Sequence, residues 1–287
     1  MTFFEKIEDY YKKATDIELV AMNGSRVNPE VTPDKFQDYD LVFFTNDVEK
    51  YRDNPSFLER FGKIMIMTEP DGEGQAGPLT YPNKEGYTYL VQYEDGNRLD
   101  LQIMDISLLK NYLIEDSLTK IVLDKKGIIE SEIIPNSRDY YLNRPNQIEV
   151  ENSVKEFYWQ FNNVLKANLR SQFLYSQEIL NLVRNELILL ISWNIGFEYG
   201  FERNLGKANN KILDFIDMED ARLLKESYNT SSKQKIFSAL RTLKNLEIKY
   251  LKELDKLGIY TMDDLLKLSD VPVKYLQSTG VTDEIIK

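Results

Sequence analysis

The chain has 287 residues, of which 42% are hydrophobic and 12% aromatic, as in a packed soluble protein rather than a disordered one. No apolar run approaches the ~20 residues of a membrane-spanning helix; residues 187–191 are far too short. The absence of Cys and His excludes disulfides, thiol nucleophiles, Cys-ligated zinc and imidazole bases. Catalysis by this chain would therefore depend on carboxylates, Lys, Tyr or a metal-bound water.

The net charge of −11 bears on partners and location. It disfavours nonspecific nucleic-acid binding, which depends on basic patches, and favours a cationic small-molecule partner. Solubility alone is the simpler explanation of the charge. The N-terminal residues alternate acidic and apolar types without a basic segment, so we expect no secretory signal and a cytoplasmic location.

The first elements form a helix, a strand, a turn and a second strand. Apolar positions at helical spacing predict a helix over residues 3–14, and an apolar run predicts a strand over 17–22. Gly24 and Ser25 follow as a small turn, where backbone amides and a hydroxyl can approach a phosphate closely. An ordinary turn is the alternative. The second strand is expected over 38–45.

Two carboxylates open this second strand. Asp38 and Asp40 are separated by one residue, and residues i and i+2 of a strand point to the same face. Like charges held this close repel unless a cation lies between them. The pattern indicates a divalent metal site with oxygen ligands, typical of magnesium. A solvated turn before the strand is the alternative.

The next elements include a hairpin that carries a third acid. We expect a helix from Asp47 that is interrupted near Pro55, a strand over 63–67 and a Gly- and Pro-rich loop over 69–86. Strands over 87–93 and 98–104 then flank an Asp-Gly turn, which is a strong hairpin signal. A last strand is expected over 121–124.

Asp100 is an acid within the apolar second strand of this hairpin, and an unpaired buried carboxylate is costly. If this strand lies beside the Asp38/Asp40 strand, Asp100 becomes the third metal-facing carboxylate. The alternative is a salt bridge to Arg98 or Lys125.

The second half of the chain has a different character. Residues 147–256 contain no Pro, and apolar residues recur every three or four positions. Helices are expected over about 149–168, 171–200, 208–216, 218–228 and 232–256, with breaks near Gly196, Gly200 and Gly206. The segment 258–287 holds two short helical patterns. The predicted fold class is α+β, with a mixed sheet and flanking helices over 1–146 followed by an all-helical domain over 147–287.

Several motifs together match one known family. They are residues 24–28 (Gly-Ser-Arg-x-Asn), 36–40 (Phe-Gln-Asp-Tyr-Asp), 95–101 (Asp-Gly-Asn-Arg-Leu-Asp-Leu) and 123–125 (Leu-Asp-Lys). The chain resembles the aminoglycoside 6-adenylyltransferases, or streptomycin adenylyltransferases, of the polymerase β-type nucleotidyltransferase superfamily. The resemblance extends to about residue 250. Similar stretches in the later part are 138–140 with 144–145, 156–159 and 193–196.

The resemblance implies transfer of AMP from ATP to the 6-hydroxyl of streptomycin, with release of pyrophosphate. In this reading Asp38, Asp40 and Asp100 hold magnesium, with two ions as the expected number, and Asp100 is also a candidate base. Lys166 resembles a family lysine that reaches the nucleotide phosphates, although a solvated helix lysine is equally plausible. Arg26 either binds the triphosphate or makes a structural pair. The active site is expected in the cleft between the two domains.

The residues that would bind the acceptor are less clearly marked. Trp159 and Tyr158 could stack on a sugar or base, but we favour core packing for both; Glu178 is either a partner for a cationic substrate or a surface acid. The sequence departs from the family at 170–172, where Arg-Ser-Gln replaces Arg-Lys-Glu or Arg-Asn-Glu, and at 178–179, where Glu-Ile replaces Asp-His. Because of these departures, two other functions stay open. One is nucleotidyl transfer to a different acceptor, whether a small molecule, a protein or a nucleic-acid end, and the other is nucleotide binding without catalysis. The sequence leaves the oligomeric state open.

Overall fold

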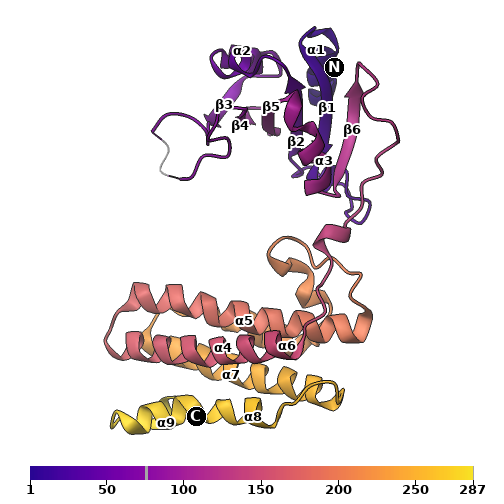
Figure 1. Cartoon of the computed structure of the whole chain (residues 1–287). Helices are drawn as coiled ribbons and strands as arrows, with labels where there is room; N and C mark the ends of the chain where they lie inside the picture. The colour runs from indigo at the N-terminus through magenta and orange to yellow at the C-terminus, as the bar shows by residue number, and fades with distance from the viewer. Residues whose placement is uncertain (75–76, 287) are drawn as a thin grey trace. The chain divides into compact units, whose positions relative to one another are not determined.

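The computed structural model describes residues 1–74 and 77–286, which leaves part of the predicted 69–86 loop outside the described residues. The chain divides into two compact units, Met1–Asp139 and Tyr140–Lys287, which are drawn from indigo to magenta and from magenta to yellow in Figure 1. Each unit has a hydrophobic core of its own. The predicted α+β class is confirmed, because a mixed sheet occupies the first unit and helices make up the second.

The first unit is built on a six-stranded sheet with the order β3-β4-β5-β2-β1-β6. Strands β2 and β5 are parallel, and the other neighbouring pairs are antiparallel. The parallel pair places the hairpin strand that carries Asp100 directly beside the strand that carries Asp40, which is the condition that the sequence analysis set for Asp100 to join the other acids. The strands are β1 (Ile17–Asn23), β2 (Tyr39–Thr45), β3 (Ile64–Thr68), β4 (Gly86–Tyr93), β5 (Arg98–Asp105) and β6 (Thr119–Asp124).

Both faces of the sheet are covered, because its central strands are apolar on both sides. Phe43 packs in a cluster with α1 (Phe3–Lys13) and α2 (Val48–Arg52), whereas its neighbour Phe44 packs in a second cluster with α3 (Leu109–Glu115). Successive strand residues point to opposite faces, so this alternation separates the two layers. The predicted first helix, the strands and the hairpin are confirmed. The helix α3 was not predicted from the sequence.

The second unit is a helical bundle formed by α4 (Gln147–Leu169), α5 (Phe173–Tyr199), α6 (Met218–Glu226) and α7 (Lys233–Lys256). The predicted helix break near Gly196 is wrong, because α5 continues to Tyr199. The glycine there serves packing: a Cβ at Gly196 would lie 2.4 Å from Cε1 of Phe201. The segment predicted as a helix over 208–216 is instead a kinked 3₁₀ stretch, Lys207–Asp214.

The last part of the chain belongs to the core of this bundle. Helices α8 (Asp263–Leu266) and α9 (Val271–Ser278) pack against α4, and Leu265 and Leu276 are buried in the same cluster as α4, α5 and α7. Among the described residues, no helix is both long enough and apolar enough to span a membrane.

A carboxylate on α7 is buried in the middle of the bundle. Glu247 is 1% exposed, and its Oε2 accepts a 2.6 Å hydrogen bond from the hydroxyl of Tyr158 on α4. Its Oε1 is buried without a hydrogen-bond partner among the described residues. Burial raises the pKa of Glu247 to about 7, although the Tyr158 hydrogen bond and the charge of Lys244 act to lower it. Between about pH 4.5 and pH 7, Glu247 is therefore protonated in the folded protein and ionised in the unfolded chain.

This buried acid makes stability depend on pH. Because its pKa is raised from 4.5 to about 7, stability falls as pH rises from about 4.5 to 7, and the full penalty remains above pH 7. Glu247→Gln removes the charged form. The free energy of unfolding of this variant, relative to that of the natural protein, should therefore be about 2 kcal/mol higher at pH 8 than at pH 5. Urea unfolding followed by circular dichroism measures this difference. Parallel pH profiles for the two proteins would contradict the assignment.

Candidate active site

The turn that ends β1 fits closely around one carboxylate. Gly24–Arg26 forms a 3₁₀ turn directly after Asn23, and Gly24 has a φ of +74°. A Cβ added at Gly24 would lie 2.4 Å from Oδ2 of Asp40. Only glycine satisfies both the left-handed backbone and the approach of the carboxylate. The Gly24 turn therefore packs directly against the side chain of Asp40.

Sheet register brings polar residues of three neighbouring strands together at this point. Asp40 on β2 lies opposite Asp100 on β5 and opposite Asn23 on β1. Paired residues on neighbouring strands project to the same face of the sheet, so the two carboxylates lie side by side. Asn23, which the sequence analysis did not single out, accepts a hydrogen bond from the Tyr112 hydroxyl and donates a 2.9 Å bond to Thr119 Oγ1.

Asp38 lies just outside the strand, because β2 begins at Tyr39. The prediction that both acids lie within the strand is wrong by this one residue. The backbone carbonyl of Asp38 accepts a 2.8 Å hydrogen bond from Nε of Arg26 in place of a strand partner. The Asp38 side chain is half-buried, and it belongs to the same cluster through an ion pair with Arg98.

Arg26 supports the segment that leads into β2. Its Nη2 donates a 2.6 Å hydrogen bond to the carbonyl of Gln37, and its guanidinium lies 3.6 Å from the centre of the Tyr39 ring. Gln37 in turn donates from Nε2 to the carbonyl of Ser25 at 3.1 Å. These contacts correspond to the structural pairing that the sequence left open for Arg26.

A guanidinium group occupies the centre of the acidic cluster. Arg98 donates from Nε to Oδ1 of Asp100 at 2.9 Å and from Nη2 to Oδ2 at 2.8 Å, and its Nη1 lies 3.4 Å from Oδ2 of Asp38. The hydrogen bonds with Asp100 are the largest influence on the pKa of Arg98; they raise it, burial opposes them, and the charges of Asp100, Asp38 and Asp40 raise it further. The salt-bridge alternative for Asp100 is thus the arrangement seen here.

The cluster has the donor chemistry of a magnesium site. Its oxygen atoms come from three half-buried carboxylates beside the Gly24 turn, and such hard ligands suit Mg²⁺. As the side chains stand, no three acidic groups of the described residues converge closely enough to hold a metal ion. The guanidinium of Arg98 lies among them instead. The three carboxylates are suitable ligands for a divalent cation. A cation can bind to all three only if the guanidinium of Arg98 moves away.

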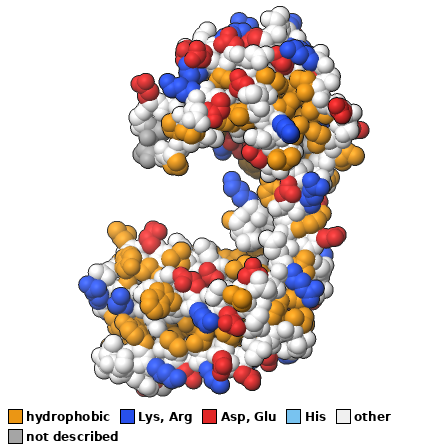
Figure 2. All heavy atoms as spheres, in the orientation of Figure 1, with side chains coloured by type: hydrophobic (Ala, Val, Ile, Leu, Met, Phe, Trp, Pro, Cys, Tyr) orange, Lys and Arg blue, Asp and Glu red, His pale blue; other side chains and the backbone are white. Residues whose placement is uncertain are grey.

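The predicted nucleotide and acceptor residues of the second unit lie on α4 and α5. Lys166 on α4 and Glu178 on α5 are both exposed. Trp159 is 69% exposed, so the prediction of core packing is wrong for it, whereas Tyr158 is 2% exposed and packs in the core as expected. At helical spacing, consecutive residues point in different directions, which explains the contrast. Figure 2 shows hydrophobic side chains on the face of this unit where α4 and α5 lie.

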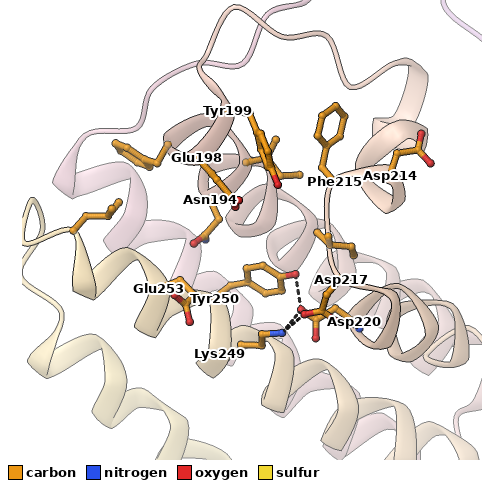
Figure 3. A pocket seen from close by; sticks show the side chains of 14 residues that line it. Asn194, Glu198, Tyr199, Asp214, Phe215, Asp217, Asp220, Lys249, Tyr250 and Glu253 are labelled. Carbon is orange, nitrogen blue, oxygen red and sulfur yellow. Dashed lines mark hydrogen bonds and ion pairs between the residues drawn. The ribbon is translucent and has the colours of Figure 1, made fainter.

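Two hollows in the second unit are lined by acids. A cavity of about 630 Å³ lies between the end of α5 and α7, where Asp220 accepts 2.6 Å bonds from both Lys249 and Tyr250 (Figure 3). These two contacts give the buried Asp220 a structural role. A second hollow, of about 440 Å³, lies between α4 and α5, and its lining contains three glutamates and no basic residue. Its lining residues include Glu149, Glu156, Glu186 and Trp193.

The chain is similar to proteins of one known family. Residues 2–269 match the family model described as streptomycin adenylyltransferase. An aminoglycoside 6-adenylyltransferase of Bacillus subtilis (strain 168) is 31% identical over 252 residues, which cover 86% of this chain and 87% of the relative. One of Staphylococcus aureus is 29% identical over 257 residues, with 88% and 90% covered. A crystal structure of an aminoglycoside 6-adenyltransferase from Bacillus subtilis is 26% identical, covers 96% of each chain and has a TM-score of 0.45.

The fold and these similarities define the chain as a nucleotidyltransferase enzyme. Within that class it belongs to the streptomycin adenylyltransferase family.

The contact between Gly24 and Asp40 yields a matched pair of variants. Gly24→Ala adds a methyl group 2.4 Å from Asp40 Oδ2 and also strains the backbone. Gly127→Ala is the control, because Gly127 has a φ of +64° and nothing within 4 Å of the added Cβ. Gly127→Ala should lose about 1–2 kcal/mol of stability, since it imposes a left-handed conformation on alanine, and Gly24→Ala should lose more because of the added contact with Asp40. Only Gly24→Ala should also weaken binding of ATP with Mg²⁺, measured by calorimetry. Equal ATP affinity in the two variants would argue against a nucleotide site at this turn.

Proposed function

We propose that this protein transfers AMP from ATP to a hydroxyl group of an aminoglycoside, with the 6-hydroxyl of streptomycin as the first candidate, and so inactivates the antibiotic. The observation that carries the proposal is the register of Asp40 beside Asp100, with Asp38 and the Gly24 turn at the same place. Membership of the streptomycin adenylyltransferase family supports it. Cytoplasmic residence stays a prediction.

The first unit would carry the nucleotide chemistry. Asp38, Asp40 and Asp100 would hold magnesium, with two ions expected, and bound metal would supply charge neutralisation at the phosphates and at the attacking and leaving oxygens. Asp100 is the candidate acceptor of the hydroxyl proton, because it lies on the face that Asp40 shares. Asp40, which lies against the Gly24 turn, would hold the metal close to the phosphates.

The turn and one lysine would bind the triphosphate. Gly24 and Ser25 offer a tight backbone turn directly beside Asp40, which suits close approach of a phosphate. Lys166 is exposed and carries a mobile charge that suits phosphate oxygen. Arg26 would act indirectly, since its hydrogen bonds to Gln37 and Asp38 position the segment that carries the metal-binding acids.

The second unit would hold the acceptor. Aminoglycosides are polycationic, and this unit offers the α4–α5 hollow, with three glutamates and no basic residue in its lining. Trp159 is exposed on α4 and could cover a sugar ring, and Glu178 is an exposed acid on α5 that could pair with an amino or guanidino group. The net charge of −11 also favours a cationic acceptor and disfavours nucleic acid.

A different acceptor is the second candidate function. The specific observation is that Gln172 stands where the family usually has a glutamate, directly before α5. Loss of that charge reduces the complementarity to a cationic substrate. AMP transfer to another small molecule or to a protein would use the same metal and nucleotide residues.

An acceptor screen tests the proposal. Pyrophosphate release from ATP with Mg²⁺ should depend on an added aminoglycoside, with streptomycin tested first. Asp40→Asn should reduce the rate on the order of a hundredfold or more, because metal charge stabilisation amounts to several kcal/mol. Mass spectrometry of the product should show one added AMP. No turnover with any aminoglycoside, together with AMP attached to another acceptor, would favour the second candidate.

The exposed tryptophan tests the acceptor site separately. Trp159→Ala should raise the KM for the aminoglycoside several-fold while leaving the KM for ATP near its natural value, since cation–π contact at an exposed ring amounts to ~0.5–1 kcal/mol. Met218→Ala is the control, because Met218 is a 91% exposed apolar residue of the same unit. If the two variants have the same KM for the acceptor, Trp159 does not bind it.

A further inference from the structure

Arg98 is placed by the same hairpin that places Asp100. It is the first residue of β5, two positions before Asp100, so both side chains project from the same face of the sheet. Its guanidinium forms a two-pronged pair, with one N–H group on each oxygen of Asp100. Such bidentate pairs are stronger and more directional than single hydrogen bonds. Both oxygens of Asp100 therefore accept a hydrogen bond from Arg98 in this state.

The same guanidinium serves the other acids of the cluster. Its Nη1 lies 3.4 Å from Oδ2 of Asp38, and the charge of Asp40 also acts on it. Arg26, the other nearby guanidinium, instead bonds to backbone carbonyls and stacks on Tyr39. Arg98 is thus a shared counter-ion for three carboxylates. One positive charge does not neutralise three negative ones, so the cluster still attracts a divalent cation.

A divalent cation and this guanidinium compete for the same oxygen atoms. Magnesium binds carboxylate oxygen at about 2.0–2.1 Å, which would place its charge next to the N–H groups that now bond to Asp100. Two positive groups at this distance repel strongly in a half-buried site. The Arg98 side chain is 41% exposed, so it has solvent to move into.

We propose that Arg98 is a competitor of the metal: it pairs with Asp100 and Asp38 and offsets part of the charge of all three acids in the metal-free protein, and it leaves them when a divalent cation binds. This inference rests on the proposed function, because it takes the three acids as the metal ligands. Arg98 thus reduces the repulsion among the acids when no metal is bound, and it also lowers their affinity for a metal ion. Metal binding and the Arg98–Asp100 pair oppose each other reciprocally.

A positioning role for Arg98 predicts the opposite effect on metal affinity. If Arg98 only positioned Asp100 as a ligand, removing its side chain would weaken metal binding. If it competes, removal tightens binding. Because the two roles differ in sign, one titration separates them. Mn²⁺ serves as the probe, since its free form is measured directly by electron paramagnetic resonance, and nucleotide is left out so that phosphate contacts do not contribute.

The experiment compares variants of the full chain. Arg98→Met, which keeps the length and loses the charge, should bind Mn²⁺ about tenfold more tightly than the natural protein. Its unfolding temperature without metal should be lower, and the rise on adding Mn²⁺ larger. Arg98→Lys keeps the charge but loses the two-pronged geometry, so its dissociation constant should lie between the two. Arg52→Met is the matched control, because Arg52 pairs with Glu49 and Asp53 in the same unit, and its Mn²⁺ affinity should not change.

Two failures are distinguishable. Equal or weaker Mn²⁺ binding by both Arg98 variants, while Asp40→Asn still weakens it, would overturn the competitor role and leave the metal site standing. If Arg98→Met does not fold, the Lys variant alone decides the sign. If the natural protein and Asp40→Asn bind Mn²⁺ equally, the proposed metal site itself is wrong, and the role of Arg98 is overturned with it.

Discussion

The repulsion among three carboxylates is the constraint on which the rest of this site depends. Asp40 and Asp100 are fixed beside each other by the parallel pairing of β2 and β5, and Asp38 joins them through Arg98. Acids gathered in this way require a positive charge close by. In the protein as described, a guanidinium supplies that charge. In the proposed enzyme, magnesium supplies it during catalysis.

Much of the first unit serves to hold these acids against their repulsion. The backbone of Gly24 leaves room for Asp40, and Arg26 fixes the segment that leads to Asp38 by bonding to its carbonyl and stacking on Tyr39. Aromatic and aliphatic layers on both faces of the sheet keep the two strands in register. Hydrophobic packing on both faces of the sheet thus keeps the acids close together in spite of their mutual repulsion.

The sequence predicted the chemistry of this site better than its details. The Gly24 turn, the acidic pair and the hairpin acid all have local signals. The pairing of β2 with β5 is a long-range contact, and the sequence left it open. The counter-ion role of Arg98 depends on a side-chain conformation that contacts both Asp100 and Asp38, which no local pattern encodes. The same holds for Gly196, which lies within α5 with Phe201 in the space that a Cβ would take, and for Trp159, which is exposed while its neighbour Tyr158 is buried.

A crystal structure of the protein with Mg²⁺ and a non-hydrolysable ATP analogue tests the central claim most directly. The account predicts metal-ligand distances of about 2.1 Å to oxygens of Asp38, Asp40 and Asp100, with the triphosphate at the Gly24 turn and the guanidinium of Arg98 withdrawn from Asp100. Metal and nucleotide bound elsewhere, with both Arg98–Asp100 hydrogen bonds intact, would contradict it.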